Sequence, residues 1–180
     1  MKILLTETRI AALREQITDL DSLIAFFEKM PDGQWYVNLF SEYISPGVYK
    51  HCAVGFLGGV LADLRIKQLI QKILPVTSQF DFWEGKYPIE MVDANNGGTS
   101  IHYKDRATGK YKKRLESLVD FSLETPKQRV LNYLNNIKRL RNLESTLKHM
   151  DEEQIQFIED LVEETLIKTE GEVTDDSIVT

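Results

Sequence analysis

The 180-residue sequence has one cysteine, three histidines and five prolines, and it lacks a long hydrophobic run. A single cysteine forms no internal disulfide, so we expect a reducing cytoplasm as its compartment. One thiol and three scattered histidines do not build a thiolate-rich zinc site, so we expect no metal and no cofactor. No apolar run reaches the roughly 18 residues of a membrane span. The first residues turn acidic too early for a signal peptide, so membrane and secreted proteins are not expected.

Acidic residues outnumber basic ones by 28 to 22, and the excess lies at the C-terminal end. From Asp151 to Thr180 there are eleven acidic residues and one lysine, so a net charge of −6 divides into −10 there and +4 on residues 1–150. The stretch from Lys104 to Lys148 holds twelve basic residues. This polarity indicates a self-paired surface, a charged partner or an oligomer contact, unless both are simply solvated helix faces. We expect one globular domain over 1–150, beginning with an amphipathic helix, and an acidic C-terminal helix with a flexible tail over 151–180.

Apolar residues recur every three or four positions in several parts of the chain, which predicts helices. The first helix covers about 6–29, unless Asp19 breaks it and caps a second one. The next runs over about 52–73 and is apolar on most sides, which predicts a central, buried helix. Another begins at Thr125-Pro126 and extends to about 150. Residues 151–154 resemble a capping box that starts a last helix.

Residues 99–103 and 110–114 flank a turn that contains glycine, which predicts a β-hairpin. Residues 75–98 are expected to be irregular and to end in a polar loop. The predicted fold class is therefore α+β and predominantly helical, with a central buried helix, flanking amphipathic helices and a small β-hairpin.

Cys52 is the residue most suggestive of catalysis, because a helix N-terminus stabilises a thiolate. A cysteine hydrolase or transferase would also need a base and an orienting group. His102 could be the base, with Asp93, Asn95 or Asn96 as its partner. The order of cysteine before histidine is that of papain-like enzymes, although there the orienting residue follows the histidine. The competing interpretation is a buried, structural cysteine.

A second candidate site binds a ligand without chemistry. The polar stretch from Asp93 to Gly98 could present Asn95, Asn96 and backbone amides to a small molecule, and it could equally be a structural turn. The aromatic residues Trp35 and Trp83, together with His102, complete the set of residues expected around such a pocket.

A third candidate is a nucleic-acid contact through the basic stretch Lys104–Arg114. Its positive charges could bind phosphates, and Tyr103 and Tyr111 could stack on bases. The acidic total and the acidic C-terminal segment oppose this interpretation, because they could neutralise the patch internally.

The chain resembles a group of small bacterial and bacteriophage proteins of unknown function. The resemblance covers roughly residues 20–137 and rests on Trp35 after a first helix, on Cys52-Ala53-Val54-Gly55-Phe56-Leu57 opening the next, on Asp93-Ala94-Asn95-Asn96-Gly97 and on Thr125-Pro126. The polar pair is Asn-Asn here, and a basic stretch separates it from the Thr-Pro helix. The group carries no established activity, so the resemblance implies an accessory protein in which the cysteine and glycine form a packing motif.

These observations favour a non-enzymatic accessory protein from a bacteriophage or bacterium. It would bind a host factor or a small ligand, or self-assemble through its coiled-coil-like amphipathic helices. The alternatives are a cysteine-dependent hydrolase using Cys52 and His102, and a nucleic-acid-associated or virion structural protein using the basic stretch.

Overall fold

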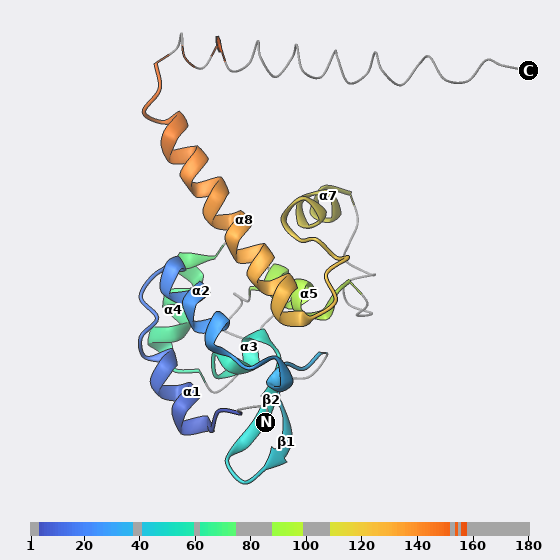
Figure 1. The fold of residues 1–180 in the computed structure, drawn as a ribbon. Coiled ribbons are helices and arrows are strands. Elements are labelled where there is room, and N and C mark those ends of the chain that lie inside the picture. The colour runs from blue at the N-terminus through green and yellow to red at the C-terminus, as the bar shows by residue number, and fades with distance from the viewer. Residues whose placement is uncertain are drawn as a thin grey trace, which may run out of the picture. The chain divides into compact units, whose positions relative to one another are not determined.

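The computed structural model describes residues 4–37, 41–59, 62–74, 88–98, 109–151, 154, 156 and 157 (Figure 1). These residues form α-helices and one two-stranded antiparallel sheet, which confirms the predicted, predominantly helical α+β class. The chain divides into two compact units, Met1–Lys138 and Arg139–Thr180, and each is described by itself. One hydrophobic core fills the first unit, with contributions from α1 to α5, α7 and α8.

The N-terminal part consists of two helices, α1 (Glu7–Arg14) and α2 (Leu20–Lys29). The expected continuous helix over 6–29 is wrong, and the alternative, a break at Asp19 that caps a second helix, is confirmed. Asp19 Oδ1 accepts a hydrogen bond from Ser22 N at 2.8 Å, and Ser22 Oγ accepts one from Asp19 N at 2.9 Å. This reciprocal capping box satisfies backbone donors that a continuous helix would have paired internally. It lets α2 turn its apolar face into the core independently of α1.

After the short 3₁₀ turn η1 (Asp32–Gln34), the chain forms a hairpin of β1 (Ser41–Ser45) and β2 (Val48–His51). Gly47 lies in the connecting turn with a φ of +71°, a conformation that favours glycine. The buried Gln34 side chain holds this region to the N-terminus: its amide donates to Leu5 O at 2.8 Å and to Tyr49 O at 3.0 Å.

The hairpin expected over 99–114 is wrong in its second strand, because Gly109–Leu118 forms helix α7. Residues 99–108 lie outside the described part of the chain. Tyr111, Leu115 and Leu118 share one helical face, and Leu115 and Leu118 are buried. That period of three to four residues becomes visible only when the segment is followed beyond Arg114.

The helix expected over 52–73 is two helices, α3 (Ala53–Phe56) and α4 (Leu64–Ile73). Gly58 and Gly59 adopt φ angles of +98° and +55°, which end α3. A Cβ at Gly58 would lie 3.1 Å from Ala62 Cα, so the chain also needs glycine there for space. Every residue of α3 is buried, which places the central buried element of the fold here.

Helix α5 (Ile89–Asn96) replaces the irregular segment expected at its position. All of its residues except Val92 are buried. A helix that is buried on every side shows no alternation of polar and apolar faces, so the sequence pattern did not reveal it. Gly97 follows it with a φ of +67° and forms the left-handed C-cap.

Helix α8 (Pro126–Leu147) confirms the predicted Thr-Pro helix start. Gln128 N donates to Thr125 Oγ1 at 3.2 Å, and Thr125 N donates to Gln128 Oε1 at 3.0 Å, which is a second capping box. In the first unit this helix buries the face formed by Val130, Tyr133, Leu134 and Ile137.

Candidate functional site

Cys52 lies at the predicted helix start but is buried, with 7% of its surface exposed. Its Sγ accepts a hydrogen bond from Gly55 N at 3.4 Å and so acts as the N-cap of α3. Burial raises the pKa of the Cys52 thiol, and the hydrogen bonds from Gly55 and neighbouring backbone amides lower it by less. A helix of four residues has a weak dipole, so it does not compensate for this burial. The protonated thiol is therefore the favoured form, which is the opposite of an activated nucleophile.

The other residues of the predicted catalytic and ligand sites are distributed differently. His102 and Trp83 lie outside the described residues. Trp35 is a core residue whose ring packs 4.9 Å from the Phe56 ring, measured between centroids. Asp93 is fully buried on α5 and accepts a hydrogen bond from Tyr111 Oη at 2.6 Å. The structure thus places Trp35 and Asp93 inside the molecule and not on a ligand-accessible surface.

Asn95 connects three separate segments of the first unit. Its Oδ1 accepts a hydrogen bond from Ala53 N at 3.0 Å, which ties α5 to the first residue of α3. Its Nδ2 donates to Tyr36 O at 2.9 Å and to Asn96 Oδ1 at 3.0 Å. The expected polar loop is therefore a helix whose amide side chain satisfies buried backbone groups. These hydrogen bonds join the segment after Cys52 to the segment around Asn95, and both segments held residues predicted for a functional site.

Arg129, which sequence reasoning did not single out, holds the C-terminal end of α5. Its Nε donates to Ala94 O and its Nη2 to Asn95 O, both at 3.0 Å, while Nη1 donates to Leu123 O at 2.7 Å and Glu124 O at 3.0 Å. A cation at this place also interacts favourably with the helix dipole. A Cβ at Gly97 would lie 3.0 Å from Arg129 Cζ, so the glycine leaves room for the guanidinium. The pairing of Gly97 with Arg129 across 32 residues has no local sequence signal.

Glu90 is a second buried charge that the sequence did not reveal. Its Oε2 accepts a hydrogen bond from Tyr133 Oη at 3.0 Å, and its Oε1 lies 3.2 Å from Arg114 Nε. The Arg114 contact is an ion pair without hydrogen-bond alignment, which leaves Oε1 without a hydrogen bond within the described residues. Burial raises the pKa of Glu90, and the Arg114 charge offsets this only in part because its side chain is half exposed.

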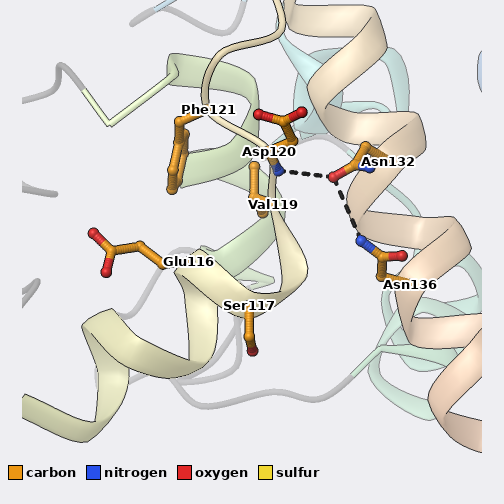
Figure 2. Close-up of a pocket in the computed structure, with 7 residues that line it drawn as sticks. All are labelled: Glu116, Ser117, Val119, Asp120, Phe121, Asn132 and Asn136. Atoms are coloured by element: carbon orange, nitrogen blue, oxygen red, sulfur yellow. Dashed lines mark hydrogen bonds between the residues drawn. The ribbon is translucent and has the colours of Figure 1, made fainter. Parts of the chain in front are cut away.

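An open hollow of about 440 Å³ lies between the end of α7, the following turn and α8 (Figure 2). Its polar lining groups bond to the protein: Asn132 Oδ1 accepts from Asp120 N at 2.8 Å, and Asn136 Nδ2 donates to Leu118 O at 3.0 Å. None of the residues that the sequence predicted for a ligand site lines it. These contacts describe a fixed junction between α7 and α8 more than an arrangement of free donors and acceptors.

The second unit carries an exposed apolar stripe on α8. Leu140, Leu143 and Leu147 are 45%, 59% and 44% exposed, and their spacing of three and four residues places them on one helix face. We call these three residues the leucine stripe. In sequence they continue the apolar period of the part of α8 that is buried in the first unit. The sequence predicted this period, but it did not predict that its C-terminal half would be uncovered.

Other site classes receive no support within the described residues. Histidine, cysteine and carboxylate side chains form no cluster of three or more that could hold a metal ion. None of the helices in this part of the chain is long and apolar enough to span a membrane. Comparison with family models, with curated proteins and with solved structures found no match to this chain.

Proposed function

We propose that this chain is a non-enzymatic accessory protein that self-assembles through the leucine stripe of α8. The proposal includes a bacterial or bacteriophage origin, which rests on the sequence resemblance alone. The observation that carries it is the exposure of Leu140, Leu143 and Leu147 along one face. Single exposed leucines are ordinary in proteins, but aligned ones form a continuous apolar surface of the kind that marks an interaction site.

The spacing of the leucine stripe also agrees with this proposal. Positions separated by three and four residues are those that helices use to form the seam of a coiled coil. Covering three leucines removes apolar surface from water, and each Å² that is buried stabilises the assembly by about 25 cal/mol. The buried, protonated thiol of Cys52 speaks against the cysteine-hydrolase alternative, which needs an accessible thiolate.

Light scattering on the full chain tests the proposal. We expect a mass above the 20.8 kDa of the single chain, and we expect the triple variant Leu140→Gln/Leu143→Gln/Leu147→Gln to return to that mass. Glutamine has nearly the helix propensity of leucine, so the variant removes apolar surface without weakening the helix.

The matched control is Asn142→Ala/Ser145→Ala, which changes two exposed residues on the opposite face of the same helix. It should keep the mass of the unmodified chain. A monomeric unmodified chain at high micromolar concentration would refute the proposal, and so would a triple variant that assembles normally.

A further inference from the structure

Asn96-Gly97 is the one Asn-Gly pair in the sequence, and it forms the C-terminal end of α5. We propose that Asn96 is a latent site of spontaneous deamidation, which the native fold keeps closed through the helical backbone and through Arg129. The site opens when the end of α5 separates from Arg129. This proposal is independent of self-assembly through the leucine stripe, and it rests on backbone conformation, burial and hydrogen bonds within the first unit.

The reaction needs only the chain itself and water. Asparagine is most reactive when glycine follows it, because glycine has no Cβ to hinder the approach of its nitrogen. Gly97 N gives up its proton to water or hydroxide and bonds to Asn96 Cγ, while the Cγ–Nδ2 bond breaks and nitrogen leaves as ammonia. Water then opens the succinimide ring at either of its carbonyls. The product at position 96 is aspartate or isoaspartate.

The native backbone opposes closure of this ring. Asn96 is the last residue of α5, and a helical ψ holds Gly97 N well out of the plane in which it could reach Asn96 Cγ. Gly97 N also donates to Ala94 O at 3.3 Å, and it would have to give up this bond before attacking. Asn96 is 8% exposed, and its Oδ1 accepts from Asn95 Nδ2 at 3.0 Å, which fixes the side-chain amide.

Arg129 fixes the same end of the helix from α8. Its Nε donates to Ala94 O and its Nη2 to Asn95 O, both at 3.0 Å, so it holds the two carbonyls that directly precede Asn96. Its Nη1 donates to two carbonyls in the turn that precedes α8. These bonds carry the full charge of a guanidinium that is itself only 8% exposed. The end of α5 therefore cannot unwind without breaking strong, buried hydrogen bonds.

The Arg129 contact also explains why a reactive pair stands at this position. Gly97 has a φ of +67°, which favours glycine, and a Cβ there would lie 3.0 Å from Arg129 Cζ. The C-cap thus requires glycine for its conformation and for space. The contact that requires glycine after Asn96 is the same one that keeps the pair closed.

Deamidation should therefore follow the fraction of molecules in which the end of α5 is open. Where opening and closing are fast relative to the chemistry, the rate is the rate in the unfolded chain multiplied by that open fraction. Isoaspartate adds an atom to the main chain, so Gly97 would no longer reach its C-cap position. Because ammonia is lost, the change is a permanent mark of molecules in which α5 has opened.

Peptide mapping of the full chain by mass spectrometry tests the site. Native and guanidinium-unfolded protein are incubated in the same mildly alkaline buffer, and conversion of Asn96 from amide to acid is followed with time. We expect Asn96 to convert faster than any other asparagine in the unfolded chain and at least about tenfold more slowly in the native chain. Equal rates in the two states would overturn the proposal, and so would an Asn96 that stays intact when unfolded.

Substitution of Arg129 tests the closing contact. We expect Arg129→Gln to raise the rate at Asn96 in the folded protein by at least about tenfold, because it removes the charge and most donors at the end of α5. Arg129→Lys keeps the charge without the planar fork and should give an intermediate rate. Arg9→Gln is the matched control, since Arg9 is an exposed arginine on α1. It should leave the rate unchanged.

A core variant separates local opening of α5 from global unfolding. Ile10→Ala truncates a fully buried residue on α1 and lowers the stability of the first unit. It is compared with Arg129→Gln at denaturant concentrations that give both variants the same free energy of unfolding. Faster deamidation in Arg129→Gln is expected, and equal rates would overturn the role of Arg129. If circular dichroism shows Arg129→Gln to be unfolded, Arg129→Lys takes its place in the same comparison.

Discussion

Substitution of Asn95 distinguishes a structural residue from a ligand-binding one. In the structure its amide oxygen accepts from Ala53 N and its amide nitrogen donates to Tyr36 O, 42 and 59 residues away in the chain. Asn95→Ala removes the amide oxygen and nitrogen of the side chain. The buried N–H of Ala53 and the part-buried C=O of Tyr36 then lose these hydrogen bonds. Asn95→Asp keeps the acceptor for Ala53 but turns a second carboxylate oxygen toward Tyr36 O and Asn96 Oδ1, which are themselves acceptors.

The size of the effect follows from the groups left unpaired. Each buried polar group without a partner costs about 1–3 kcal/mol, so the two groups left by Asn95→Ala should lower the free energy of unfolding by about 2–6 kcal/mol. Asn95→Asp should be at least as destabilising at neutral pH, because a buried carboxylate facing acceptors is poorly compensated. A typical domain has about 5–15 kcal/mol in total, so either loss is easily measured.

Urea unfolding followed by circular dichroism measures both variants. Asn135→Asp on α8 is the matched control, because Asn135 is exposed and its side chain donates only to Leu131 O one turn earlier, within the described contacts. It should change stability by no more than about 0.5 kcal/mol. An Asn95→Ala protein within about 1 kcal/mol of the unmodified chain would refute the structural role and would revive Asn95 as a ligand-binding residue.

Two further predictions concern buried titratable groups. Native Cys52 should react with iodoacetamide at least about 100-fold more slowly than in the urea-unfolded chain, because its thiol is buried and its pKa is raised; rapid native alkylation would restore the enzyme hypothesis. Glu90 has a folded-state pKa above its unfolded value of about 4.3, so its contribution to stability is present below that pH and is lost as pH rises through the folded pKa. In urea titrations, the stability of Glu90→Gln relative to the unmodified chain should therefore grow as the pH rises above about 4.3. The exposed control Glu144→Gln should show no such trend. A stability difference between Glu90→Gln and the unmodified chain that does not change with pH would contradict the cost of burying Glu90.

The predicted sites show where sequence reasoning reaches its limit in this protein. The start of a helix at Cys52 could be predicted, because the turn before it and the apolar residues after it are close by in the sequence. The burial of its thiol could not be predicted, because it depends on Trp35, Phe56 and α5, which pack around the same region. The role of the residues that sequence analysis singled out around Asn95 was hidden for the same reason: their partners lie far away along the chain. His102 and Trp83 remain predictions.

The sequence by itself determined the helical character of the chain and several helix ends. The capping boxes at Asp19, Thr125 and Asp151 each join residues three positions apart, so their chemistry is complete within a few residues. The period of apolar residues along α8 was equally local. These features depend on backbone geometry and need no distant partner.

Only the tertiary structure decided which of those faces became buried. It turned Asp93 and Asn95 into core residues, because α3, α7 and the Tyr36 segment supply their hydrogen-bond partners. It also left α8 buried only as far as Ile137. Leu140, Leu143 and Leu147, which follow the same helical spacing, are exposed. Burial is a property of what packs against a helix and not of the helix's own sequence, which is why one apolar period forms a core in the first unit and an exposed stripe in the second.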